Sequence, residues 1–73
     1  NGVLVFNHTT LADAAAEFNR YNKRKLVIGD PAVASLEIGG PFQANSIEAF
    51  TDVAQHILQL HVAYRGNDIV ITR

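Results

Sequence analysis

Apolar residues recur at helical spacing between Thr9 and Asn22, and this segment is the best-defined element of the chain. The spacing places one stripe of apolar side chains on a single helix face, at Leu11, Ala14, Ala15, Phe18 and Tyr21. Short β-type runs, Val3–Phe6 and Leu26–Ile28, lie on either side of it. The pattern therefore predicts a strand, a helix and a strand, with Thr9 or Thr10 as the helix cap. If the two strands are parallel in one sheet, their crossover should be right-handed.

The middle of the chain alternates between short apolar runs and residues that interrupt regular structure. Gly29-Asp30-Pro31 should end the second strand, and residues 32–34 are expected to form a tight turn. A third strand is predicted over Ser35–Ile38, with Leu36 in the core. Gly39-Gly40-Pro41 follows it, and because proline cannot donate to a sheet, this stretch should lie at an edge.

The second half repeats the order of strand and helix. Asn45 is predicted to cap a second helix, with Glu48 three residues later as in a capping box. The apolar stripe of that helix is expected at Ile47, Phe50, Ala54, Ile57 and Leu58. Two alternating runs, 60–65 and 68–72, flank Gly66-Asn67 and predict an antiparallel hairpin.

These elements predict an α+β fold with the order β-α-β-β-α-β-β. A constant offset of 36 superposes the two halves, so that Leu11 meets Ile47 and Leu26 meets Val62. Few residues are identical at this offset, and we infer no duplication from it. We expect the two helices to pack together and to be covered by small sheets. With 73 residues, 48% of them hydrophobic, the chain should form one domain over residues 1–73.

The charge of the chain argues against a nucleic-acid partner, because its formal net charge is −1 and such binding depends on a basic face. Four of the six Lys and Arg residues nevertheless cluster after the first helix, at Arg20, Lys23, Arg24 and Lys25. Two interpretations stay open. The cations can complement the negative end of the helix dipole, or they can form a docking patch for an acidic partner.

The sequence contains no arrangement of residues typical of an enzyme. His8, His56 and His61 lack the spacing of metal ligands, and there is no cysteine. No pair of carboxylates is predicted to face one cleft, and the Gly-Gly pair lacks the other residues of a phosphate-binding loop. The strand and helix order also occurs in RNA-recognition motifs, but Ser35–Ile38 lacks their aromatic signature. We therefore expect a protein that is not an enzyme and needs no cofactor or metal.

Several segments together resemble the C-terminal domain of FecR-type anti-sigma regulators. They are Leu4-Val5-Phe6, Leu11-Ala12-Asp13-Ala14, Phe18-Asn19-Arg20-Tyr21-Asn22, Val27-Ile28 with Asp30-Pro31, and Leu36 to Phe42. The similarity spans residues 2–71, and its most specific part is the Asn-Arg-Tyr-Asn segment before a strand that ends in Asp-Pro. The domain is also similar to the STN domain of secretins and TonB-dependent transducers. Thr10 and Ser46 depart from the pattern, which commonly has proline at each helix start, and Pro41 stands where a small residue is usual.

The resemblance implies a periplasmic interaction domain of a single-pass inner-membrane protein in cell-surface signalling of Gram-negative bacteria. Such a domain would bind the signalling domain of an outer-membrane TonB-dependent transducer and regulate iron uptake through an extracytoplasmic-function sigma factor. The chain would then be a fragment of a larger, membrane-anchored protein. The alternative is the STN domain of a transducer or secretin itself. A small-molecule sensor is disfavoured, because so small a core leaves little room for a pocket of roughly 300 Å³.

Two surfaces are candidates for partner binding. One is the basic segment after the first helix, with Arg20, Tyr21, Lys23 and Arg24. The other is an exposed sheet edge around residues 35–40, where Ser35, Glu37 and Gly39 would accept a partner strand through unpaired backbone groups.

Overall fold

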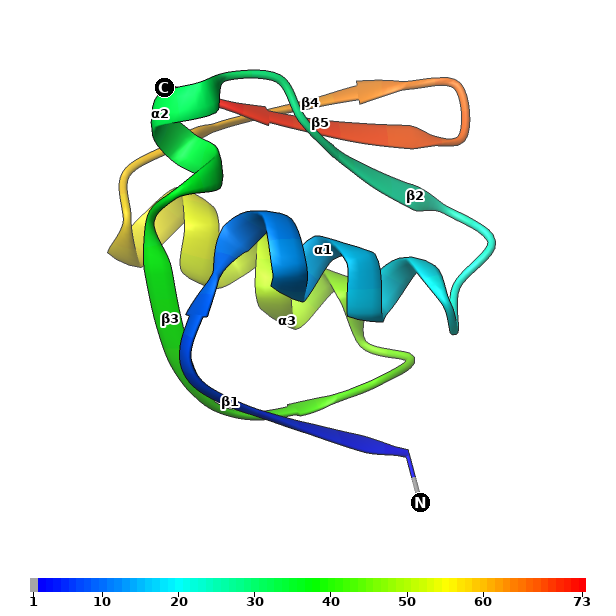
Figure 1. Cartoon of the computed structure of the whole chain (residues 1–73). Helices are drawn as coiled ribbons and strands as arrows, with labels where there is room; N and C mark the ends of the chain where they lie inside the picture. The colour runs from blue at the N-terminus through cyan, green and yellow to red at the C-terminus, as the bar shows by residue number, and fades with distance from the viewer. Residues whose placement is uncertain (1) are drawn as a thin grey trace.

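Two small sheets enclose a layer of helices in the computed structural model, which describes residues 2–73 (Figure 1). The elements along the chain are β1 (Val3–Thr10), α1 (Leu11–Asn19), β2 (Lys25–Ile28), α2 (Pro31–Ala34), β3 (Glu37–Gln43), α3 (Ile47–Asp52), the π-helical turn η1 (Val53–Ile57), β4 (His61–Arg65) and β5 (Asp68–Thr72). The predicted α+β class and strand order are confirmed, and the short helix α2 is an addition. None of the helices in the described part has the length and hydrophobicity needed to cross a bilayer.

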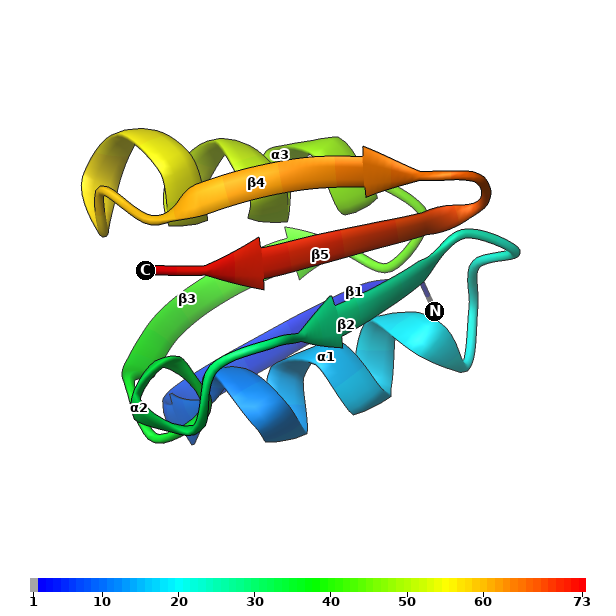
Figure 2. The same ribbon diagram turned by 90° about the horizontal axis from the view of Figure 1, so that it is seen from above.

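The strands divide into a two-stranded sheet, β1-β3, and a three-stranded sheet, β2-β5-β4. β1 and β3 are antiparallel, whereas β5 runs parallel to β2 and antiparallel to β4 (Figure 2). The predicted hairpin is confirmed, with Gly66-Asn67 as its turn. The strands on either side of α1 lie in different sheets, so the parallel pairing considered from the sequence does not form.

The offset of 36 between the two halves corresponds to a real equivalence of elements. Leu11 and Ile47 are the first residues of α1 and α3, and Leu26 and Val62 are the second residues of β2 and β4. The chain thus contains two strand-helix-strand units. Their first strands pair with each other, and their last strands flank β5.

Helix α1 forms where its apolar stripe predicts it. The Oγ1 atom of Thr10 accepts a hydrogen bond of 3.2 Å from the backbone N–H of Asp13, which identifies Thr10 as the cap. The stripe is buried from Leu11 to Phe18. The helix ends at Asn19, earlier than predicted, so Tyr21 leaves the stripe and is 56% exposed.

The segment after β2 is a helical turn, and the prediction of a tight turn at residues 32–34 is wrong. The Oδ1 atom of Asp30 accepts a 2.9 Å hydrogen bond from the N–H of Ala32, and Pro31 occupies the first turn. Both residues are typical of a helix start. Leu36 falls in the connection to β3 and is 39% exposed, so its predicted place in the core is also wrong.

Strand β3 continues through the Gly-Gly-Pro stretch and ends at Gln43, so the prediction that it stops at Ile38 is wrong. The strand is an edge strand, as Pro41 predicts. Gly40 has φ of 104° and lies opposite Phe6, next to a bulge in β1. A backbone conformation of this kind favours glycine, which explains the residue at this position.

The second helix is capped and shaped differently from the prediction. Ser46, and not Asn45, is the residue at the cap, and its side chain makes no capping hydrogen bond. In η1 the N–H of Leu58 bonds to the carbonyl of Val53 at 3.0 Å, a step of five residues. This wider turn rotates the face of the helix, and Ile57, predicted in the core, is 73% exposed.

All four phenylalanines of the chain form one cluster at the centre of the domain. The closest pair is Phe18 with Phe50, whose ring centroids lie 5.0 Å apart and join α1 to α3. Phe6 and Phe42 pack against Phe18 from the β1-β3 sheet, at 5.9 and 6.0 Å. The cluster therefore fixes this sheet against both helices.

Candidate functional site

The segment after α1 is held in place by two asparagine side chains. Asn22 donates from Nδ2 to the carbonyl oxygens of Phe18, at 2.9 Å, and Ala44, at 2.7 Å. Asn19 bonds to both the N–H and the carbonyl of Leu26, at 2.7 and 3.1 Å, as a neighbouring strand would. These bonds connect the end of α1 to β2 and to the approach to α3, so the segment is a fixed surface.

Lys25 supports the helix-dipole interpretation of the basic cluster. Its Nζ donates to the carbonyl oxygens of Asn19 and Asn22, at 2.7 Å each, directly after the last turn of α1. At this place the ammonium group satisfies the carbonyl of Asn19, the last residue of α1, and lies at the negative end of the helix dipole. Lys25 is therefore the member of the cluster with an evident structural role.

The other cations lie on the surface. Arg20 has its Nη1 atom 3.4 Å from Oε2 of Glu17, in an exposed pair that contributes little to stability. The guanidinium of Arg24 lies 5.2 Å from the ring centroid of Tyr64, which is itself exposed. Lys23 forms no ion pair within residues 2–73, and Tyr21 exposes more than half of its surface. The structure thus gathers Arg20, Tyr21, Lys23 and Arg24 around one end of α1.

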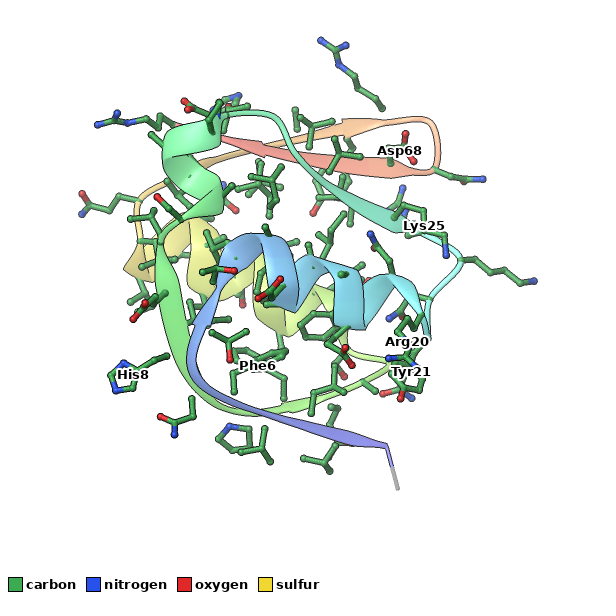
Figure 3. All side chains as sticks on the ribbon, in the orientation of Figure 1. Phe6, His8, Arg20, Tyr21, Lys25 and Asp68 are labelled. Carbon is green, nitrogen blue, oxygen red and sulfur yellow. The ribbon has the colours of Figure 1, made fainter. Side chains whose placement is uncertain are left out.

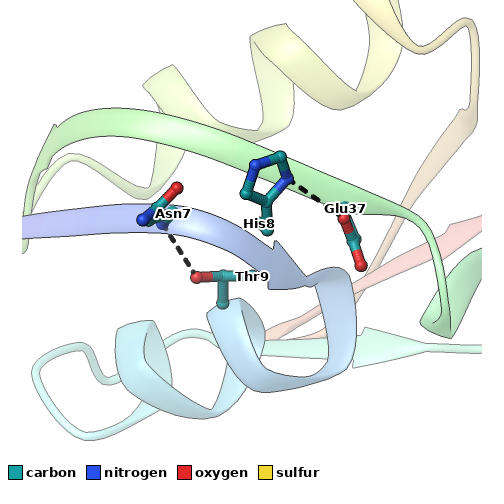
Figure 4. Close-up of polar contacts among 4 residues, drawn as sticks. All are labelled: Asn7, His8, Thr9 and Glu37. Atoms are coloured by element: carbon teal, nitrogen blue, oxygen red, sulfur yellow. Dashed lines mark hydrogen bonds and ion pairs between the residues drawn. The ribbon is translucent and has the colours of Figure 1, made fainter.

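The second predicted surface is dispersed over two elements. Ser35 directly follows α2 as its C-cap and donates from Oγ to the carbonyl of Ala32 at 3.2 Å, so it is not part of a strand. Glu37 begins β3, and its Oε1 atom lies 3.4 Å from Nδ1 of His8 (Figure 4). Gly39 lies within β3, where an added Cβ would be 3.5 Å from the carbonyl oxygen of Phe6.

The bulge in β1 faces this second surface. The N–H of Asn7 bonds to Oγ1 of Thr9 at 3.1 Å, and His8 between them has φ of 50° (Figure 4). The His8 and Glu37 side chains are 85% and 55% exposed, and they form an ion pair only when the imidazole is protonated. Solvent screens such a pair strongly. Figure 3 shows His8 at the opposite end of the domain from Arg20 and Tyr21, so the two candidate surfaces are separate.

The surface along β1 was not predicted from the sequence. Val3 and Val5 are 49% and 75% exposed, and a groove of about 400 Å³ runs between β1 and α1. A second groove of about 380 Å³ lies between α2 and the segment before β4. Both exceed the volume that the small core was expected to allow. Within residues 2–73 no three His, Asp or Glu side chains are grouped so that they could hold a metal ion.

No protein-family model matches the chain, and no curated protein matches it in sequence. Its fold is nevertheless found in two crystal structures of a protein assigned as an anti-sigma factor, from Parabacteroides distasonis ATCC 8503. The structure at 1.65 Å resolution matches with a TM-score of 0.81 and 22% identity, and that at 2.50 Å with 0.78 and 25%. Each match covers 99% of this chain and 34% of the other. The chain therefore has the fold of a domain that makes up about a third of that protein.

Proposed function

We propose that this chain is the partner-binding domain of an anti-sigma regulator of the FecR type, and that it is not an enzyme. The observation that carries the proposal is the match of almost the whole chain to one domain of the anti-sigma factor structures, with a TM-score of 0.81. The resemblance of the segment Phe18-Asn19-Arg20-Tyr21-Asn22 to FecR-type regulators supports it independently.

The proposed place of action is the periplasm of a Gram-negative bacterium, where the domain would belong to a single-pass inner-membrane protein. Its partner would be the signalling domain of an outer-membrane TonB-dependent transducer. Binding would pass siderophore occupancy to an extracytoplasmic-function sigma factor and so regulate iron uptake. In this role the domain needs a well-ordered fold and no reactive group, and the hydrogen bonds of Asn19 and Asn22 help to fix the end of α1 against β2 and the approach to α3.

Calorimetric titration of the 73-residue chain with the transducer signalling domain encoded beside its gene tests this proposal. The expected result is saturable one-to-one binding. No heat at concentrations of about 1 mM would contradict the proposal, because that concentration exceeds the range of transient protein complexes. Binding to a secretin ring or to the transducer's own barrel would instead identify the chain as an STN domain.

Charge reversal at Arg20, Lys23 and Arg24 tests the basic segment separately. If the segment docks an acidic partner, the triple variant should bind more slowly at low salt and similarly to the parent chain at high salt. Reversal of the exposed Arg73 alone is the control at a distant basic position. Unchanged association in the triple variant would exclude the segment as the docking surface.

A further inference from the structure

Strand β1 has an open edge, because it pairs with β3 alone. The N–H of Ala44 donates to the carbonyl of Gly2 at 2.7 Å, which shows which residue pairs of β1 and β3 are hydrogen-bonded to each other. In an antiparallel pair the residues alternate between facing the partner strand and facing away from it. It follows that the N–H and carbonyl groups of Val3 and Val5 point away from β3, towards the open edge.

This edge lacks the features that usually block unwanted pairing. Natural edge strands carry lysine, proline or a bulge, or they are covered. On β3, Pro41 lies opposite Val5 and has no N–H at the outward-facing position. On β1, the four residues Val3–Phe6 carry no charge and no proline, and the bulge begins only after them. The two edges of the same sheet therefore differ, and the one on β1 is able to accept a strand.

A groove with an acidic rim lies beside the open edge. It is bounded by residues 4–6 of β1 and by Asp13, Ala16 and Glu17 of α1, and has a volume of about 400 Å³. Asp13 has no ion-pair partner within residues 2–73, and Glu17 has only its exposed pair with Arg20. Ala16, which has a small side chain, lines the groove together with the two acidic residues. The groove thus combines backbone groups for pairing with negative charge on the facing helix.

We propose that β1 and this groove bind an extended segment of a protein partner that carries lysine or arginine side chains. The segment would pair with the backbone of Val3 and Val5, as in β-strand addition. Alternate side chains would cover the exposed valines on the outer face, and the others would reach Asp13 and Glu17. A second copy of this chain fits less well, because its own Val3–Phe6 would bring no cation to the carboxylates. This inference rests on the proposed function, for which it names the docking surface and the chemistry of the partner.

The probe for a test is a blocked nine-residue peptide, Thr-Val-Lys-Val-Thr-Val-Lys-Val-Thr, and its counterpart with glutamate in place of lysine. We expect the lysine peptide to shift the amide resonances of residues 3–6 and 13–17 and to slow hydrogen exchange at Val3 and Val5. The glutamate peptide should bind more weakly. Shifts at residues 20–24 or along β3, equal binding of the two peptides, or no shifts at all would overturn the proposal.

Two variants separate backbone pairing from charge. Val5→Pro removes one outward N–H and should abolish binding, with the amide resonances of Phe18 and Phe50 as the check that the core is intact. Asp13→Asn with Glu17→Gln should weaken lysine-peptide binding about fivefold, as expected for two exposed charge pairs. Glu48→Gln is the matched control, because Glu48 is also an acidic residue in the first turn of a helix. It should leave lysine-peptide binding unchanged.

If Val5→Pro does not fold, the double charge variant and the glutamate peptide still decide the question. Dimers of the free chain that involve the β1 amides would overturn the proposal in favour of a second copy. Peptide binding at β1 without binding of the transducer domain would support the groove and contradict the proposed function. Binding of the transducer domain without any shift of the β1 amide resonances would support the proposed function and contradict the groove as the docking surface.

Discussion

Replacement of Asn22 by alanine should lower the free energy of unfolding by more than is usual for a substitution in a loop. The half-buried Asn22 side chain donates to the carbonyls of Phe18 and Ala44, at 2.9 and 2.7 Å. It thereby ties the end of α1 to the segment before α3, where Ala44 lies 22 residues after Asn22 in the sequence. Alanine supplies no donor, and both carbonyls lose a partner in a partly buried site.

The expected loss is about 2 kcal/mol in the free energy of unfolding, since each hydrogen bond contributes about 1 kcal/mol. A chain of this length has a total stability of about 4–11 kcal/mol, so the loss is a large part of it. The melting temperature should fall by roughly 8–16 °C, because 1 kcal/mol corresponds to about 4–8 °C in a domain of this size.

Asn45→Ala is the matched control, because Asn45 is exposed and its side chain makes no hydrogen bond within residues 2–73. It should change the free energy of unfolding by less than about 0.5 kcal/mol. Urea unfolding followed by circular dichroism gives both values from the midpoints and slopes. Equal losses for the two variants, or a loss below about 0.5 kcal/mol for Asn22→Ala, would show that the two Asn22 hydrogen bonds do not stabilise the domain.

Two further pairs of substitutions test the packing and the capping. Phe18→Ala should cost about 3–5 kcal/mol, a large part of the stability of the domain, because Phe18 is fully buried among three other phenylalanines. Tyr21→Ala should cost less than about 1 kcal/mol, and similar melting temperatures for these two variants would contradict the assigned core. Thr10→Ala should cost about 1 kcal/mol through loss of the cap bond to Asp13. Ser46→Ala should cost almost nothing in the same urea experiment. A larger loss for Ser46→Ala than for Thr10→Ala would contradict the assignment of Thr10 as the hydrogen-bonding cap.

Local patterns in the sequence predict the elements that depend on nearby residues. The stripe from Leu11 to Phe18 predicts α1, Gly66-Asn67 predicts the hairpin, and the glycines of β3 match a bulge beside Phe6. Each feature is determined by residues a few positions apart or by the φ angle that a glycine permits. The basic cluster was also recognisable, although only Lys25 has the helix-dipole role that its position suggested.

The remaining features depend on contacts or helix geometry that a simple periodicity does not contain. Ile57 fits a regular helical stripe, but the π-helical turn that ends at Ile57 shifts that stripe and exposes the side chain. The helix α2 was predictable in principle, because Asp30 followed by Pro31 is a cap and first-turn signal. The open edge of β1 was not, since the sequence does not say that β1 and β2 belong to different sheets. Exposed valines in Val3–Phe6 are recognisable only once the pairing with β3 is known.

The proposed role is tested most directly by an amide chemical-shift titration of the labelled 73-residue chain with the transducer signalling domain encoded beside its gene. We expect saturable shifts at residues 3–6 and 13–17, with slower hydrogen exchange at Val3 and Val5. If no residue of the domain shifts at partner concentrations of about 1 mM, the result would contradict the proposal that this chain is the partner-binding domain of an anti-sigma regulator.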